Sequence, residues 1–328
     1  MKKFWLFLPL IAGCTGTSEP PTLAWLAVGS GTQINFYDAN GFRPLGGEPL
    51  LAHTWELDSD LADLALFDNR LWLLLENRLV SQPLNQLEGQ PEFDLEWEFP
   101  EGIDCTGGYL RPGEDILLAV CQGIPFAATA LNLERLPDPP VREDPSFALG
   151  PDDILIYLTN DEIGVYWDPD ELDQTSDLEP EYDDFDLLDF RYDLAGNRGY
   201  ALFTQGSGLA AQARMLPVQI SAFLNQPPDI GFETASEIEE FEPRKLSLNQ
   251  EIVLGYGKGF AQFQPQTTAV INSTVSYEVG VVGDDGFLYL AQGNRIDCYN
   301  YREDNEFQDG QSNEIDLVPE ALILIPLD

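Results

Sequence analysis

The sequence predicts an all-β chain folded as a seven-bladed β-propeller, and three observations support this prediction. Short apolar runs recur roughly every 40 residues, each after two or three polar turn residues. A second turn and strand usually follow in the same unit, as in Glu76–Arg78 before Leu79 and Val80. Helical periodicity is almost absent from the body of the chain. Several short strands per repeat are typical of a propeller, whose blades are small antiparallel sheets.

The repeat can be followed along the chain by its apolar runs. They are Gln33–Tyr37, Leu71–Leu75, Ile116–Val120, Ile154–Leu158, Gly199–Phe203, Ile252–Tyr256 and Phe287–Ala291. Runs such as Leu71–Leu75 are apolar throughout rather than alternating, which indicates strands that are buried on both faces. The unit Asp284–Ala291 resembles the D-G-x-L-Y-V-A blade strand that is common in bacterial propellers.

The two ends of the body predict how the ring closes. Leu23–Val28 and Gln33–Tyr37 supply only part of a blade, and Ala321–Leu327 is an apolar strand that stands alone. Pairing this last strand with the first ones completes one blade and removes two exposed sheet edges. We therefore expect one propeller domain over residues 23–328. Six or eight blades, or two packed β-sandwiches, are the alternatives.

The first fourteen residues have the order of an export signal. Two lysines precede an apolar run from Phe4 to Ala12, and small residues stand just before Cys14. The run is shorter than the ~20 apolar residues that a membrane-spanning helix needs. An ordinary signal peptide requires only the small residues before its cleavage site, so it remains the alternative to a lipoprotein signal.

The ending Ile11-Ala12-Gly13-Cys14 resembles the lipobox of bacterial lipoproteins. This resemblance implies that residues 1–13 are a signal peptide, that Cys14 carries the lipid, and that residues 14–22 form a flexible tether. Residue 15 is threonine rather than aspartate, which in Gram-negative lipoproteins implies sorting to the outer membrane. We therefore expect a lipid-anchored protein of the cell envelope that faces the periplasm or the cell surface.

The charge of the chain restricts its partners. It has 57 acidic and 16 basic residues, and its formal net charge is −41. Such a field repels nucleic acids and anionic lipid headgroups, so we expect no nucleic-acid partner and no membrane contact except through the lipid anchor. Salt adaptation, solubility, and attraction of divalent cations or a basic partner are the three explanations for this charge.

The cysteines predict one disulfide. With Cys14 lipidated, Cys105, Cys121 and Cys298 remain in an oxidising compartment. Cys105 and Cys121 stand symmetrically about Gly113, the turn of a predicted hairpin, so we expect a cross-strand disulfide between them. Cys298 lies in a predicted strand, and we expect a buried free thiol.

The segment Asp168–Phe190 is dense in carboxylates and has no basic residue. Calcium takes six to eight oxygen ligands on a flexible loop, and Asp168, Asp170, Asp173 and Asp177 are the candidate ligands. The segment departs from the EF-hand pattern, since proline follows Asp168 and glycine is absent from the sixth position. We therefore expect a solvated loop between blades and no cofactor, and calcium binding is the alternative.

Two classes of function fit these observations. His53 is the only histidine, and no nucleophile motif accompanies it, so we expect no catalytic residue. The first class is an envelope binding or scaffold protein that holds a protein partner through a propeller face. In outline this resembles the propeller lipoprotein of the outer-membrane β-barrel assembly machinery. The second class is a carboxylate-based hydrolase or lyase that acts on extracellular carbohydrate.

Overall fold

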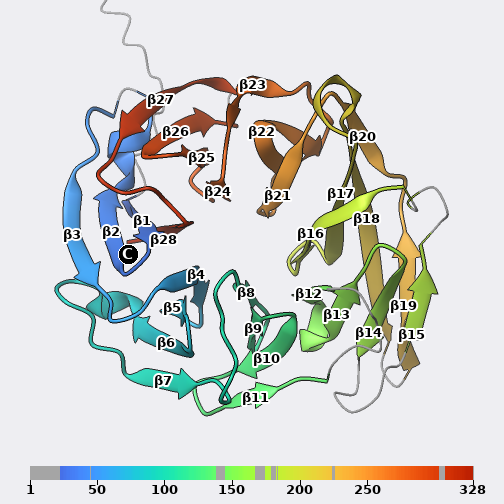
Figure 1. Ribbon diagram of the computed structural model, residues 1–328, viewed down its shortest axis with the longest axis horizontal. Coiled ribbons are helices and arrows are strands. Elements are labelled where there is room, and N and C mark those ends of the chain that lie inside the picture. Colours follow the sequence, from blue (N-terminus) through green and yellow to red (C-terminus); the bar gives the residue numbers. More distant parts are fainter. Residues whose placement is uncertain are drawn as a thin grey trace, which may run out of the picture.

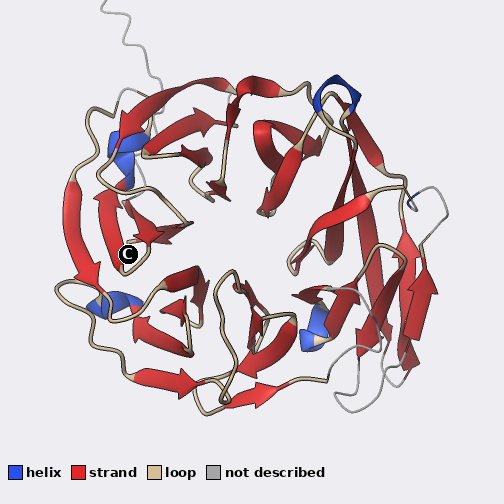
Figure 2. Cartoon of the chain, viewed as in Figure 1, coloured by secondary structure: helices blue, strands red, loops and turns tan. Residues whose placement is uncertain are grey.

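The computed structural model describes residues 23–44, 46–137, 145–166, 174–178, 182, 184–223, 226–302 and 307–327. Over these residues the strands form seven antiparallel sheets around a central channel, so the predicted seven-bladed β-propeller is confirmed (Figure 1). Helical structure in the described part is limited to short 3-10 turns (Figure 2). These turns are η1 (Ala39–Phe42), η2 (Leu84–Gln86), η3 (Pro151–Asp153) and η5 (Gly208–Ala210). None of the described helices is long and apolar enough to cross a membrane.

Blades 1 to 4 are four-stranded, with their strands in the following order from the channel outwards. Blade 1 consists of β28 (Ala321–Pro326), β1 (Ala24–Ser30), β2 (Gln33–Asp38) and β3 (Leu51–Glu56). Blade 2 consists of β4 (Leu61–Phe67), β5 (Arg70–Leu75), β6 (Arg78–Pro83) and β7 (Leu95–Glu98). Blade 3 consists of β8 (Tyr109–Pro112), β9 (Leu117–Cys121), β10 (Ile124–Ala128) and β11 (Leu133–Arg135). Blade 4 consists of β12 (Ser146–Leu149), β13 (Leu155–Leu158), β14 (Glu162–Tyr166) and β15 (Gln174–Asp177).

Blades 5 and 6 depart from the four-stranded pattern, to which blade 7 returns. Blade 5 consists of β16 (Asp186–Asp193), β17 (Arg198–Gln205), β18 (Gln212–Phe223), β19 (Gln226–Phe232) and β20 (Ser236–Glu239). Blade 6 consists of β21 (Pro243–Leu248), β22 (Val253–Gln264) and β23 (Ile271–Ser276). Blade 7 consists of β24 (Val279–Val282), β25 (Phe287–Gln292), β26 (Arg295–Asn300) and β27 (Gln308–Glu314). The long β18 pairs with β20 along its first residues and with β19 along its last ones.

The ring closes within blade 1, as the sequence predicts. β28 pairs antiparallel with β1, from Gly29 opposite Ala321 to Ala24 opposite Pro326. The last strand of the chain therefore covers the edge that β1 would otherwise expose to the channel. Blade 1 holds the ring together because its strands come from both ends of the body (Figure 1).

The hydrophobic core is divided among the seams between blades. Seven clusters of buried side chains are found among the described residues, one between each pair of neighbouring blades. The second strands contribute many of them, and every residue of β9 and of β13 is buried. Because both faces of these strands meet a neighbouring blade, they are apolar at consecutive positions rather than at alternating ones.

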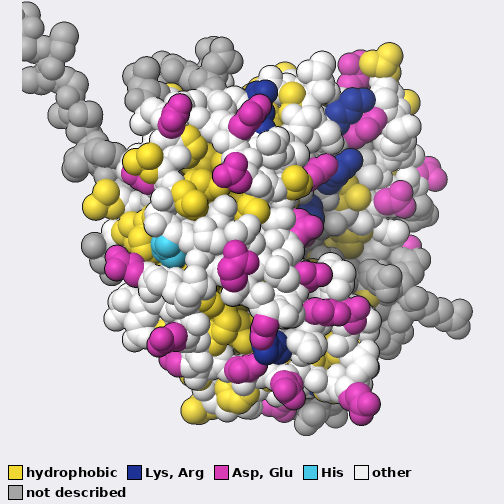
Figure 3. Space-filling view, turned by 60° about the vertical axis from the view of Figure 1, so that its left-hand side comes forward, with side chains coloured by type: hydrophobic (Ala, Val, Ile, Leu, Met, Phe, Trp, Pro, Cys, Tyr) yellow, Lys and Arg dark blue, Asp and Glu magenta, His cyan; other side chains and the backbone are white. Residues whose placement is uncertain are grey.

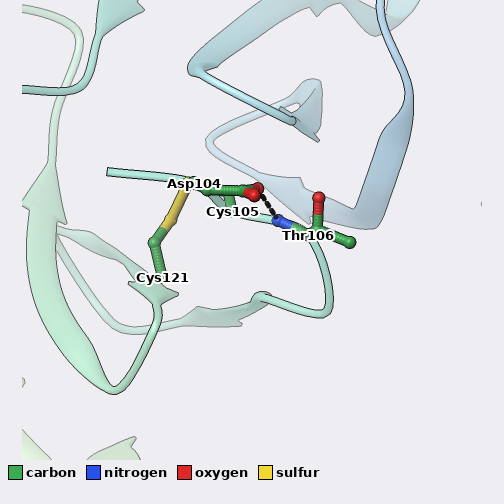
Figure 4. Close-up of a disulfide and its surroundings, with 4 residues drawn as sticks. All are labelled: Asp104, Cys105, Thr106 and Cys121. Carbon is green, nitrogen blue, oxygen red and sulfur yellow. Dashed lines mark hydrogen bonds between the residues drawn. A yellow bond between two sulfur atoms is a disulfide. The ribbon is translucent and has the colours of Figure 1, made fainter. Parts of the chain in front are cut away.

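A disulfide joins Cys105 to Cys121, with a Cα–Cα distance of 4.4 Å (Figure 4). Its place in the hairpin differs from the predicted one. Pro112 pairs with Leu117 across a four-residue turn, so the register does not put Cys105 opposite Cys121. Cys105 precedes β8, and its N–H donates to the Glu76 carbonyl of blade 2 at 2.7 Å. The disulfide therefore ties the connection between blades 2 and 3 to the end of β9.

The interpretation of Asp168–Phe190 as one exposed loop is wrong for its second part. Asp189 and Phe190 are buried in β16, the innermost strand of blade 5. Tyr182 and Phe185 are buried in the seam between blades 4 and 5. Aromatic side chains between the carboxylates anchor this part of the segment, because burying their large apolar surface is favourable.

Candidate functional site in the central channel

All seven blades contribute to one hollow of about 210 Å³ in the central channel. Its lining is rich in ionisable groups. The basic side chains are Arg111, Arg191, Arg244 and Lys245, and the acidic ones are Asp63, Asp189 and Glu320. Four of the 16 basic residues of the chain therefore line a single hollow, within a protein whose net charge is −41.

Asp189 is the best-partnered of these groups. Its carboxylate accepts hydrogen bonds from Arg111 Nη2 at 3.0 Å, from Arg191 Nε at 3.1 Å and from the backbone N–H of Leu246 at 3.0 Å. Burial opposes its negative charge, but the two guanidinium groups together hold the pKa of Asp189 below its usual value. Asp189 is therefore ionised at neutral pH and connects blades 3, 5 and 6.

Arg111 extends from β8 towards blade 5. Its side chain is 13% exposed, and its guanidinium lies 4.3 Å from the centre of the Tyr109 ring. Burial, and then the nearby charge of Arg191, lower the pKa of Arg111. Two cations thus share the one carboxylate of Asp189, and a further negative charge beside them would reduce their mutual repulsion.

Irregular pairing places several of these side chains. The innermost strands β4, β16 and β21 each have a register shift, between Leu61 and Asp63, between Leu187 and Asp189, and between Pro243 and Lys245. The residues inserted by these shifts are Ala62, Leu188 and Arg244, and all three line the channel. Such bulges change the direction of neighbouring side chains. In a regular strand Arg244 and Lys245 would point to opposite faces, but here both reach the hollow.

The other predicted site residues lie elsewhere. Cys14, with the signal peptide and the tether, is outside the described residues, as are Asp168, Asp170 and Asp173. Asp177 is exposed in β15 and pairs with Glu162 of β14. Within the described ranges no group of three His, Cys, Asp or Glu side chains is arranged to hold a metal ion. The calcium site remains a prediction.

His53 and Cys298 are both structural residues. The His53 ring stacks on Phe36 with 4.2 Å between ring centres and meets Trp25 edge-on at 4.9 Å. Burial lowers the pKa of His53, against weaker opposing effects of the Leu87 carbonyl and the Glu88 charge. Cys298 is a buried free thiol, as the sequence predicts, and burial raises its pKa.

Neither Asp189 nor Asp153 has the surroundings of the general acid that a glycoside hydrolase needs. Its general acid has a raised pKa, whereas the pKa of Asp189 is lowered. Burial raises the pKa of Asp153, but its two oxygens accept hydrogen bonds from the N–H groups of Glu114 and Asp115 at 2.7 and 2.8 Å. Asp153 of blade 4 therefore holds the turn between β8 and β9 of blade 3.

Sequence reasoning missed the channel residues. In the sequence, Arg111 stands two positions before Gly113 of the predicted hairpin turn, and Asp189 is one carboxylate among many in the acidic segment. A usable signal was the rarity of basic residues in this chain, since only two lysines, Lys245 and Lys258, follow the signal segment. Because basic residues are so few after the signal segment, Lys245 is a candidate for a specific role.

Comparison with known proteins identifies the fold alone. No family model and no curated protein matches the chain. The β-propeller domain of Cps50 (Swd1) from Myceliophteria thermophila has a TM-score of 0.63 at 11% identity, over 85% of this chain and 96% of that domain. AztD from Citrobacter koseri has a TM-score of 0.56 at 10% identity, over 93% and 99%.

KlAtg21, whose structure was solved in complex with the coiled coil of AgAtg16, has a TM-score of 0.54 at 12% identity, over 90% of this chain and 100% of that one. All three are similar to the present chain along nearly their whole length. At these identities the similarity extends to the propeller architecture, and function has to be argued from the residues of this chain.

Proposed function

We propose that this protein is a lipid-anchored binding protein or scaffold of the bacterial cell envelope, and that it holds a protein partner on one side of its propeller. The signal segment that ends at Cys14 supports the anchor. The propeller fold is consistent with binding, since it presents a rigid surface made of many strands. KlAtg21, a propeller of the same architecture, was solved in complex with a coiled coil.

The observation that carries the binding role is an apolar patch on blade 1, formed by Leu23, Leu50 and Leu51. These side chains are 61%, 69% and 50% exposed. The strand pairing brings them to one end of the blade, because Tyr37 of β2 pairs with Leu51 and Trp25 of β1 pairs with Asp38. Exposed apolar groups that gather in this way are typical of interaction sites.

The surroundings of the blade 1 patch define the partner further. Figure 3 shows hydrophobic side chains near the histidine on this side of the molecule, with carboxylates scattered around them. A hollow of about 910 Å³ lies beside the patch and is lined by Leu23, Trp25, Leu87 and Leu327 among others. A partner with an apolar segment flanked by basic side chains would match both the patch and its acidic rim.

Membrane attachment is tested by Cys14→Ser. The expected result is a protein that is released from the membrane fraction or remains unprocessed, because the acceptor for the lipid is lost. Cys298→Ala serves as the control, since Cys298 is buried in the propeller. Unchanged membrane attachment of Cys14→Ser would contradict the proposed anchor.

Partner binding is tested by cross-linking and affinity capture of the native protein from membranes. Leu51→Asp should reduce the capture of the bound protein at least about tenfold, because a charge in the contact area excludes the apolar segment. Leu131→Asp is the matched control, since Leu131 is 87% exposed on the turn between β10 and β11. Equal capture by both variants would exclude the blade 1 patch, and the absence of any stable partner would exclude the scaffold role.

A further inference from the structure

The central channel contains more positive charge than its own carboxylates neutralise. Asp189 is shared by Arg111 and Arg191. Asp63 accepts hydrogen bonds from the backbone N–H groups of Leu64 and Leu110 at 2.9 and 2.8 Å, and Glu320 accepts one from the N–H of Gly31 at 2.7 Å. Neither Arg244 nor Lys245 forms a salt bridge within the described part of the chain, so these charges are left for another partner.

Several donors in the hollow are also unused. Arg191 bonds to Asp189 through Nε, and no described residue accepts a hydrogen bond from its two terminal nitrogens. Arg111 Nε is buried and makes no hydrogen bond. The Arg191 side chain is 29% exposed, so its terminal nitrogens are open to an acceptor that enters the hollow.

We propose that the channel is a binding site for a small oxyanion, a phosphate or a polycarboxylate, held by Arg191, Arg244 and Lys245. A guanidinium presents its N–H groups as a planar fork that matches the oxygens of carboxylate and phosphate, and an ammonium adds a compact charge. The site is separate from the blade 1 patch, so it does not require the protein partner proposed above.

The size of the hollow restricts the ligand. A volume of about 210 Å³ lies below the 300–1,000 Å³ of typical sites for drug-sized molecules. It suits an anion of a few carbon or phosphorus atoms, such as citrate or inorganic phosphate. An anion with several oxygens is favoured over acetate or chloride, because it can contact Arg191, Arg244 and Lys245 at the same time.

The acidic exterior does not prevent binding at physiological salt. The Debye length is then about 8 Å, so carboxylates on the outer strands act only weakly on an anion inside the ring. Contacts within the hollow are screened less, because the lining excludes part of the solvent. The four cations and three carboxylates of the lining therefore act on an anion in the hollow more strongly than the carboxylates of the outer strands do.

The test is isothermal titration of the intact chain with citrate, with phosphate and with acetate, at about 0.15 M sodium chloride. We expect saturable binding at one site for citrate or phosphate, and weaker binding of acetate. Binding of only one of the first two would assign the ligand to the polycarboxylates or to the phosphates. Failure of both to bind beyond a sodium chloride blank of matched ionic strength would overturn the proposal.

Lys245→Gln and Lys258→Gln provide matched variants. Both lysines are exposed in blade 6, but Lys258 lies on β22 outside the channel lining and approaches Glu242 only to 3.9 Å. Lys245→Gln should weaken citrate or phosphate binding about tenfold, through the loss of one charge-assisted contact, while Lys258→Gln leaves it unchanged. Equal weakening by both would indicate nonspecific attraction and overturn the site. Lys245→Gln should still capture the envelope partner, because the channel is separate from the blade 1 patch. Loss of anion binding with normal capture therefore tests the channel site independently of the proposed function.

Discussion

Closure of the ring by β28 can be tested at a single side chain, Ile325. This side chain is 0% exposed and belongs to the cluster between blades 1 and 2, with Ile34 and Leu71. Ile325→Ala leaves a cavity in this seam, for which large-to-small core substitutions give a loss of about 2–5 kcal/mol in the free energy of unfolding. Since stable proteins unfold with about 5–15 kcal/mol, this is a substantial fraction of the total.

Deletion of residues 321–328 should be more severe. It removes the buried side chains of Leu322 and Ile325, each worth about 1.5–3 kcal/mol by burial alone, and it uncovers the edge of β1. We expect the truncated chain to unfold or to melt at a much lower temperature than the intact protein.

Urea unfolding followed by tryptophan fluorescence measures both effects, because Trp25 pairs directly with Ile325. Val318→Ala is the control for Ile325→Ala, since Val318 is 52% exposed just before β28 and should change the free energy of unfolding by less than about 0.5 kcal/mol. The closure argument fails if Ile325→Ala is as stable as Val318→Ala, or if the truncated chain unfolds at the same urea concentration as the intact one.

Three further predictions concern the disulfide, the histidine and the acidic residues. The double variant Cys105→Ser/Cys121→Ser should lose about 3 kcal/mol in urea unfolding, because the disulfide closes a loop with a sequence separation of 16. Burial lowers the pKa of His53, so the unfolded state binds the imidazole proton more readily than the folded state does. The contribution of His53 to the free energy of unfolding is therefore fully present above about pH 6.5 and is lost as the pH falls from there towards the folded-state pKa. Thermal melts of His53→Gln at different pH values should lack this contribution. Raising salt from about 0.01 M to 0.15 M should raise the melting temperature by screening the net charge of −41, and a larger rise with calcium at matched ionic strength would establish a site in segment 168–190.

The parts of the fold that the sequence predicted are those set by local burial. Strands such as β9 and β13 are buried at every position, so they appear in the sequence as unbroken apolar runs after a turn. The lone strands at both ends of the body predicted the closure, because an open ring leaves unpaired edges. The disulfide partners were also predicted, but their register was not. The turn between β8 and β9 is centred beyond Gly113, and Cys105 lies in the preceding connection rather than in the ladder.

The channel could not be predicted because its residues meet only when the ring has closed. Arg111 and Asp189 are separated by 78 positions along the chain, yet they form a salt bridge of 3.0 Å. The innermost strands are partly exposed and irregular, so they lack the apolar runs that identify the second strands. The register shift before Asp189 depends on how β16 fits against β17, which no local pattern in the sequence specifies.

The cations of the channel require local explanations, and these differ from residue to residue. Two unit charges about 15 Å apart in water interact by only about 0.3 kcal/mol, and salt reduces this further, so the many outer carboxylates do not hold cations in the middle of the ring. Arg111 and Arg191 are explained by Asp189, whose buried charge they compensate. Arg244 and Lys245 have no such partner in the described part of the chain, and they lie on a strand whose bulge brings both of them to the hollow. Because the stability of the fold does not account for this arrangement, binding of an anion is the explanation that these two residues favour.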